Sequence, residues 1–343
     1  MGLSGLRKTA FAALMTLAWN GAALACQPNY VVADGDTLFT IAEANLGDVT
    51  KWSLIFYNNP GLEGGDLMNV PAGSTLAIPC PEGTVRAPDP TPLQQADAEM
   101  VLVTGSNYAP FTDRGWPGEG MLTEVVNAAL ENSPSPVPYA ITWENDWSKH
   151  LNLLAESDLD MGFPWFRPDC RQTPNEFRCK NFHFSEPLVD LVILLFARAD
   201  NPIAFAQDSD LHGKTLCRPA GYFTHDLEQE GRNWITNGLV KLEQPATPDD
   251  CFRLLMEGSV DAVAVNEFLG VQKMFELGLT EKVVPLTNPL SVQGLHVVIS
   301  KRHWRGTTHL YRFNAGLAEL KKTARYNEIV SRHLSLFWDQ VKK

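Results

Sequence analysis

The feature that most restricts the fold is a regular alternation of strand-like and helix-like segments from residue 99 to the end of the chain. By hydrophobic periodicity, we expect strands at 100–104, 139–143, from 160, and at 214–217, 260–265 and 295–300. Helices are expected at 121–130, 147–156, 249–256, about 267–277, 309–322 and 325–340. Such alternation is typical of α/β folds with parallel strands. Because the pattern occurs twice, it predicts two lobes, one formed by about 98–197 with 294–343 and the other by about 202–287. Binding sites in such folds lie at the carboxyl ends of strands, in the crevice between lobes.

A proline-rich segment, 81–97, divides the chain into two parts. Its first twelve residues contain four prolines and no apolar period, which is typical of an extended linker. A small unit, 26–80, precedes this segment, and the two-lobe unit, 98–343, follows it. The small unit reads as a strand, two helices and a closing strand. The sequence therefore predicts an α/β protein with a small βααβ domain and a larger two-lobe domain.

The first 25 residues have the organisation of a secretory signal peptide. Arg7 and Lys8 precede an apolar stretch at about 10–19, and the stretch ends in Ala23-Leu24-Ala25 before Cys26. This stretch is shorter than the roughly 20 apolar residues that a membrane span needs. We expect cleavage after residue 25 and a periplasmic protein that can associate with the cell wall. Lipidation of Cys26 stays open as an alternative, although Ala23 stands where such sites usually carry leucine.

The charge of the chain restricts its partners. Cleavage of the signal removes two of the 28 basic residues and none of the 40 acidic ones, so 26 basic residues face 40 acidic ones and the net charge is −14. Nucleic-acid binding requires clustered lysine and arginine. The composition therefore argues against nucleic acid as a partner, but net charge alone does not identify a ligand.

Six cysteines remain after cleavage, an even number in an oxidising compartment, and disulfides are expected. Six cysteines allow 15 pairings. Proximity in the sequence favours Cys26–Cys80, Cys170–Cys179 and Cys217–Cys251. The alternative is a structural metal, but the chain has no Cys-x-x-Cys and no histidine at ligand spacing from a cysteine pair. We expect neither a metal nor a cofactor.

The small unit carries turn and apolar residues in a specific order: Tyr30-x-Val32, Gly35-Asp36-Thr37-Leu38, Ile41-Ala42, Trp52-x-x-Ile55, Asn59-Pro60, Gly73, Leu76 and Ile78-Pro79. This pattern resembles a LysM module. The resemblance implies binding of N-acetylglucosamine glycans such as peptidoglycan, in a groove between the first strand–helix loop and the loop before the last strand. The contacts it implies are Gly35, Asp36, Thr37, Leu38 and Asn59. Gly35 and Asp36 also suit a turn and a helix cap.

The two-lobe unit contains short motifs that resemble those of the periplasmic solute-binding proteins of amino-acid-type ABC importers, often called family 3. These motifs are Tyr108-Ala-Pro110-Phe111, Trp147 with Leu151 and Leu154, Phe184-Ser185-x-Pro187, Asp210-Leu211-x-Gly213-Lys214, and Gly258-x-Val260-Asp261-Ala262-Val263. The resemblance covers nearly all of 98–343. It implies a Venus-flytrap fold that closes two lobes over a small solute, with hinges near 197–202 and 287–293.

The resemblance also implies where the solute would be held on the first lobe. Arg171 matches an arginine that clamps the ligand carboxylate, a role suited to a bidentate guanidinium, and Arg167 is a competitor for it. Arg171 can equally be a surface residue beside the disulfide. Tyr108, Phe111 and Trp165 are candidates for the aromatic walls of the solute site, although aromatic residues more often pack in the protein core.

On the second lobe the sequence departs from the family pattern. Asn266 stands where amino-acid binders carry a carboxylate for the ligand ammonium, and the neighbouring Glu267 is a candidate substitute. Thr224 is a candidate contact, but the bulky Tyr222 and Phe223 stand before it. These departures argue against a standard α-amino acid as the solute.

The sequence favours a binding protein over an enzyme. It contains no Gly-x-Ser-x-Gly and no His-Glu-x-x-His. The first hypothesis is a solute-binding protein that is held on peptidoglycan and feeds an ABC permease. The second is a receptor or accessory protein without transport. The third is a cell-wall hydrolase, since paired carboxylates for glycoside hydrolysis are not excluded by sequence.

Overall fold

The computed structural model describes residues 29–62, 70–79, 98–229 and 231–341. The signal peptide, the linker at 81–97 and the Cys26–Cys80 pairing lie outside the described residues. In the small unit, two strands and two helices follow the expected order: β1 (Asn29–Val31), α1 (Leu38–Leu46), α2 (Trp52–Tyr57) and β2 (Thr75–Ala77). β1 and β2 pair antiparallel.

Local sequence explains where α1 begins and ends. The Thr37 hydroxyl oxygen accepts a hydrogen bond from the backbone N–H of Thr40, and the Thr40 hydroxyl oxygen accepts one from the backbone N–H of Thr37. This reciprocal cap satisfies amide groups that the first turn leaves unpaired. Gly47 ends the helix in the left-handed region at φ 66°, which glycine adopts without strain.

The larger unit is built on one continuous ten-stranded sheet. Eight strands follow one another in the order β4 (Tyr139–Trp143), β3 (Met100–Thr104), β5 (Met161–Phe166), β12 (Ser291–Ser300), β7 (Val189–Arg198), β10 (Ala262–Asn266), β8 (Thr215–Cys217) and β9 (Lys241–Glu243). β6 (Phe182–Phe184) pairs with β12, and β11 (Val283–Pro285) pairs with β7. The strands are parallel within each outer group and antiparallel at β12 and β7.

The two long strands, β7 and β12, connect the lobes. The first half of β7 pairs with β12, and its second half, from Ile193, pairs with β10 of the second lobe. β12 in turn runs on from β7 to pair with β5 of the first lobe. The chain thus enters the second lobe inside β7, before the boundary expected at 197–202. Because β7 is buried along almost its whole length, its sequence is that of one uninterrupted strand and does not mark where the lobes meet.

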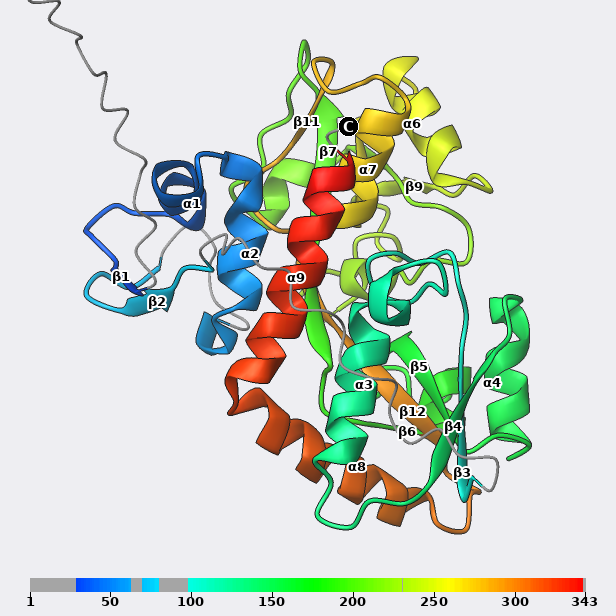
Figure 1. The fold of residues 1–343 in the computed structure, drawn as a ribbon. Coiled ribbons are helices and arrows are strands. Elements are labelled where there is room, and N and C mark those ends of the chain that lie inside the picture. Colours follow the sequence, from blue (N-terminus) through cyan, green and yellow to red (C-terminus); the bar gives the residue numbers. More distant parts are fainter. Residues whose placement is uncertain (1–28, 63–69, 80–97, 230, 342–343) are drawn as a thin grey trace, which may run out of the picture.

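Helices cover both lobes (Figure 1). The first lobe carries α3 (Met121–Glu131), α4 (Trp147–Ala155), α5 (Phe177–Asn181), α8 (Gly306–Lys321) and α9 (Ala324–Val341), and the second carries α6 (Pro248–Met256) and α7 (Glu267–Glu276). α3 and α8 approach closely because Gly316 lacks a side chain where an added Cβ would overlap the carbonyl oxygen of Ala129. None of the helices in the described ranges is long and apolar enough to cross a membrane.

The small unit packs directly on the two-lobe unit. In Figure 1, α2 lies beside α9. Every residue of α2 is buried, as expected for a helix enclosed on all sides. Tyr57 donates a hydrogen bond of 2.7 Å from its hydroxyl to Glu267 at the start of α7, and Asn58 accepts one of 2.8 Å from the hydroxyl of Ser331 on α9. The unit therefore touches an element of each lobe.

Two disulfides are present in the described residues, and both confirm the pairings expected from sequence. Cys170 bonds to Cys179 across nine residues, and Cys217 bonds to Cys251 across 34 residues. The second links the end of β8 to α6. Across the described ranges, no three His, Cys, Asp or Glu side chains gather as they would around a metal ion.

Candidate functional site

A cavity of about 500 Å³ lies between the lobes, within the range of small-molecule sites. The first lobe contributes the loop after β3, α4, the end of β5 and α5, and the second contributes the loop after β8 and the end of β10. β7 and β12 supply Ile193 and Leu295. The other lining residues are Asn107, Tyr108, Trp147, Leu151, Pro164, Trp165, Phe166, Arg178, Arg218, Gly221, Tyr222, Phe223, Ala264, Val265 and Asn266.

Aromatic side chains form the first-lobe wall. The ring of Trp147 lies edge-on to Tyr108, with 6.2 Å between centroids, and edge-on to Trp165, with 5.9 Å. Trp147 also donates a hydrogen bond of 3.3 Å to the carbonyl of Ser106, which holds α4 against the loop after β3. Edge-to-face contacts of this kind favour one arrangement of the rings. The wall is therefore apolar and held in place by its own packing.

The second-lobe wall is a loop that reaches toward the first lobe. Gly221 takes a φ of 82°, which glycine tolerates, and the chain then presents Tyr222 and Phe223. The ring of Phe223 meets Phe166 of the first lobe at a centroid distance of 4.5 Å. The two bulky residues that the sequence marked as a departure thus bring the lobes into contact across the cavity.

A buried ion pair fixes this loop. Arg218 and Asp226 are both about 1% exposed or less and are joined by two hydrogen bonds of 2.6 and 3.0 Å. Arg218 also donates to the carbonyl of Phe223 at 2.6 Å and to that of Ala264 at 3.1 Å. Burial raises the pKa of the Asp226 carboxyl, but the Arg218 guanidinium outweighs it, so the pKa lies below its usual value. The pair therefore carries no net charge into the cavity.

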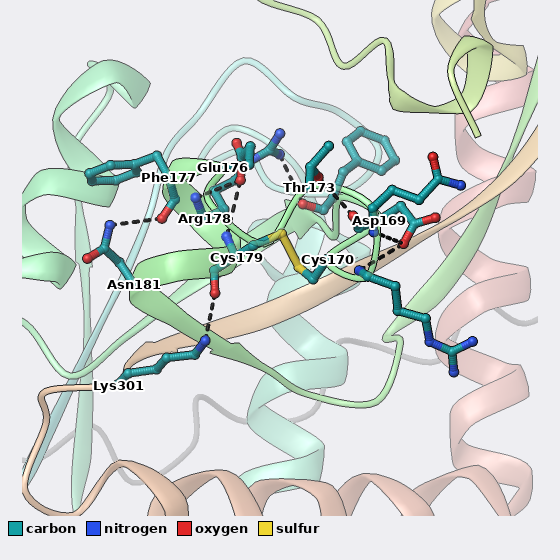
Figure 2. Close-up of a disulfide and its surroundings, with 12 residues drawn as sticks. Asp169, Cys170, Thr173, Glu176, Phe177, Arg178, Cys179, Asn181 and Lys301 are labelled. Carbon is teal, nitrogen blue, oxygen red and sulfur yellow. Dashed lines mark hydrogen bonds and ion pairs between the residues drawn. A yellow bond between two sulfur atoms is a disulfide. The ribbon is translucent and has the colours of Figure 1, made fainter. Parts of the chain in front are cut away.

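Arg178 is the second cation in the lining, and it comes from α5 (Figure 2). Glu176 caps this short helix by accepting hydrogen bonds from the backbone amides of Arg178 and Cys179. The side chain of Arg178 donates to Glu176 at 3.1 Å through Nε and to the carbonyl of Phe166 at 3.0 Å through Nη1. The Cys170–Cys179 disulfide closes the loop around it, so the guanidinium is held at the end of β5.

Burial sets the protonation of the tyrosines and histidine at the site. It raises the pKa of the Tyr108 and Tyr222 hydroxyls, which stay neutral at physiological pH and can donate hydrogen bonds. It lowers the pKa of His225, whose ring nitrogen Nε2 lies 2.8 Å from the side-chain oxygen of Gln293 on β12. His225 is therefore neutral near pH 7.

Of the solute contacts expected from sequence, the structure brings Tyr108, Trp165 and Asn266 together around the cavity. Phe111 lines a neighbouring cavity of about 300 Å³, which shares Tyr108 and Asn266 with the first. Asn266 caps α7, since its side-chain oxygen accepts a hydrogen bond of 3.0 Å from the amide of Leu269.

The other expected contacts lie elsewhere. Arg171 is exposed in the turn that Asp169 caps, and it does not line either cavity, because the disulfide turns this part of the loop outward. Arg167 lies over the ring of Phe184, 5.8 Å from its centroid. Thr224 precedes a short 3₁₀ turn and is absent from both linings. Glu267 faces Tyr57 of the small unit instead of the cavity.

The residues expected to contact a glycan differ in their exposure and in the hydrogen bonds they already make. Leu38 is fully buried in the core of the small unit. Asn59 joins α2 to β2 through hydrogen bonds to the carbonyls of Ile55 and Ala77 and from the amide of Ala77. Gly35 is exposed in a turn, and the half-buried Asp36 accepts hydrogen bonds from the Ala33 amide and the Tyr30 hydroxyl. Of the expected contacts, Gly35 is thus exposed, and Asp36 and the capping Thr37 are half-buried.

Sequence reasoning missed several lining residues. Arg178 lies in the same stretch between β5 and Phe184 as Arg171, and its position two residues after the helix-capping Glu176 was the available signal. In the sequence, Trp147 is recognisable only as part of a family motif, and Tyr222 only as a bulky departure from the family pattern. No sequence signal distinguishes the buried Arg218 from an exposed arginine at a strand end.

No protein-family model matches this sequence, and neither does any curated protein. Among solved structures, the chain is similar to a histidine kinase sensor domain with similarity to periplasmic binding proteins, at 24% identity and a TM-score of 0.52 over 69% of this chain and 96% of that one. It is also similar to the BvgS periplasmic VFT2 domain of Bordetella pertussis, at 17% identity and a TM-score of 0.50 over 68% and 93% of the two chains. The substrate binding protein of an amino acid ABC transporter matches at 20% identity and a TM-score of 0.48, over 69% and 99%. The larger unit of this chain thus has the two-lobe fold of periplasmic binding proteins.

Proposed function

We propose that this chain is a binding protein, not an enzyme, that captures a small solute between its two lobes. The observation that carries the proposal is the cavity of about 500 Å³, which both lobes line and which is walled by aromatic rings. Concave, largely apolar sites with a few placed polar groups are typical of small-molecule binding.

The arrangement of the walls supports a closing motion. The first lobe holds the solute through Tyr108, Trp147 and Trp165, and the second covers it with Tyr222 and Phe223. Only β7 and β12 carry the sheet from one lobe to the other among the described strands. Two connecting strands suit a hinge, because a few residues at or near their ends can absorb the change in backbone angles that closure requires.

We further propose that the protein works in the periplasm after cleavage of residues 1–25, and that residues 26–80 are a LysM module that binds peptidoglycan. The βααβ order and the turn at the exposed Gly35 and the half-buried Asp36 support the module. Cosedimentation of the full chain with isolated peptidoglycan sacculi tests it. We expect chitooligosaccharides to release the bound protein, and a chain that stays in the supernatant at low salt would remove the module from the proposal.

Delivery of the solute to an ABC permease is the first candidate role. A receptor role without transport is the second, and one observation favours it: the small unit packs on α7 and α9, so that it is positioned to respond to the lobes. A sensor domain of similar fold is known. Uptake assays in a strain that lacks this protein distinguish the two roles. Uptake of the solute should fall if the protein delivers it to a permease, and it should stay unchanged if the protein is a receptor.

Solute capture is tested by thermal unfolding of the full chain with amino acids, organic acids, quaternary amines, sugars and muropeptides. A compound at 100 times its Kd adds roughly 2.7 kcal/mol to the free energy of unfolding. Tyr222→Ala should weaken binding of a hit roughly tenfold or more, because Tyr222 lines the cavity. Tyr311→Ala is the matched control, since Tyr311 is 72% exposed on α8 and lines neither cavity. Failure of every compound to raise the unfolding temperature would refute the proposed function.

A further inference from the structure

The charged residues that line the cavity all carry the same sign. Two of the lining residues are cationic, Arg178 and Arg218, and none is acidic. Arg218 is neutralised by Asp226, which is wholly buried and also accepts a hydrogen bond from Ser291. Arg178 is also ion-paired, with Glu176 at 3.1 Å, but 19% of its side chain is exposed against 1% for Arg218, so Arg178 is the cation that can still bond to a solute. Its partner Glu176 occupies only Nε, and Nη2 makes no hydrogen bond to any described residue.

Two further side chains of the same lining, Asn266 and Trp165, offer hydrogen-bond donors. Asn266 uses its side-chain oxygen to cap α7, so its amide nitrogen is the group it can offer to a solute. Trp165, also in the lining, has a buried indole N–H without an acceptor in the described part of the chain. An unpaired buried donor costs roughly 1–3 kcal/mol. An oxyanion fits such a set of donors, and Arg178 can bind a carboxylate with directed hydrogen bonds.

A cationic group on the solute would lack a partner. Glu267, next to Asn266 in sequence, is 2% exposed and receives the hydroxyl of Tyr57. Asp113 lines only the neighbouring cavity, where its two oxygens accept the backbone amides of Asn107 and Gly115 at 2.9 and 2.7 Å. An ammonium that is removed from water without a counter-charge is strongly disfavoured.

The remaining lining favours a flat apolar body. Trp147, Trp165 and Phe166 come from the first lobe, and Tyr222 and Phe223 from the second. Aromatic rings stack on or pack edge-on to other rings. A solute with an aromatic ring would lie between the two walls, with its acid group toward Arg178.

We infer that the inter-lobe cavity selects aromatic carboxylates that carry no ammonium group, over the amino acids of the same shape. The inference rests on the proposed solute-binding function and adds the class of solute to it.

Three probes that share one ring test the inference: 3-phenylpropanoate, L-phenylalanine and 2-phenylethylamine, each titrated into the full chain by calorimetry at pH 7. We expect 3-phenylpropanoate to bind at least tenfold more tightly than L-phenylalanine, and 2-phenylethylamine to give no measurable heat. Tighter binding of L-phenylalanine than of 3-phenylpropanoate would overturn the inference, and loss of that binding in Asp113→Asn would identify the ammonium partner.

A single isosteric substitution should weaken or cancel the expected preference. Asn266→Asp puts a carboxylate on the cavity wall, and aspartate caps a helix as well as asparagine does, so α7 is retained. We expect the affinity ratio of L-phenylalanine to 3-phenylpropanoate to rise roughly tenfold or more in this variant. Asn237→Asp is the control, because it makes the same change of charge at an exposed position that lines neither cavity. An unchanged ratio in Asn266→Asp would contradict the inference.

The outcomes separate the inference from the function on which it rests. If none of the three probes binds while another compound of the broader panel does, solute capture stands and the aromatic acid class is wrong. If no compound binds at all, both fail.

Discussion

Glu267 makes the stability of the protein depend on pH in a direction opposite to that of most carboxylates. Its side chain is buried, Oε1 accepts the Tyr57 hydroxyl, and Oε2 has no hydrogen-bond partner among the described residues. Burial raises its pKa from the usual 4.5 to about 8, and the hydrogen bond from Tyr57 offsets only part of this. The folded chain therefore holds a proton that the unfolded chain releases near pH 4.5.

The sign and size of the effect follow from proton linkage. Between pH 4.5 and 8 the unfolded state binds fewer protons than the folded state, so the free energy of unfolding falls as the pH rises. The stabilisation is complete below pH 4.5 and is lost as the pH passes about 8. At about 1.4 kcal/mol per pH unit, the loss is on the order of 3 kcal/mol between pH 5 and 7 and on the order of 4 kcal/mol between pH 5 and 8.

Glu267→Gln isolates this contribution, because glutamine keeps an acceptor for Tyr57 and does not titrate. Urea unfolding of both proteins, followed by tryptophan fluorescence at pH 5, 6, 7 and 8, measures it. We expect the variant to gain stability relative to the wild type as the pH rises, and Glu281→Gln, at an exposed position, to follow the wild type. Parallel curves for Glu267→Gln and the wild type would refute a buried, protonated Glu267.

Three further substitutions test the packing around the site. Arg218→Met leaves Asp226 as an unpaired buried charge and should cost roughly 3–5 kcal/mol in urea unfolding; a cost below about 1 kcal/mol would contradict the buried pair. Serine at both Cys217 and Cys251 opens a loop of 34 residues and should cost roughly 4 kcal/mol, whereas an unchanged urea midpoint would argue against the bond. Gly316→Ala forces α8 away from α3 and should cost roughly 1–3 kcal/mol in thermal unfolding; an unchanged melting temperature would exclude the close approach.

Most of the strands and helices and two disulfides could be predicted because their signals are local, whereas the short elements β6, β9, β11 and α5 were not predicted. Periodicity over a few residues marks the apolar face of a helix, as at α3, and cysteines close in sequence have few other partners. Boundaries were less accurate: α8 begins at Gly306 instead of 309, since the helix starts before its apolar face does. The two-lobe architecture also followed from the order of the elements.

The direction of individual side chains could not be predicted. Arg171 and Arg178 lie in one disulfide-closed loop and are chemically identical, and what separates them is the cap by Glu176, which turns Arg178 toward β5. Asn266 and Glu267 are neighbours at the end of one strand, yet they face opposite sides. Alternation along a strand indicates that two neighbours diverge, but it does not say which of them meets the solute.

The contact of α2 with both lobes has a mechanical consequence. Tyr57 meets α7 and Asn58 meets α9, so a rotation of one lobe against the other must shift at least one of these hydrogen bonds. Conversely, tension applied to residues 29–79 enters the two lobes at two separate points and acts as a torque across β7 and β12. A protein anchored through this unit would therefore have its opening and closing biased by the direction in which the anchor pulls.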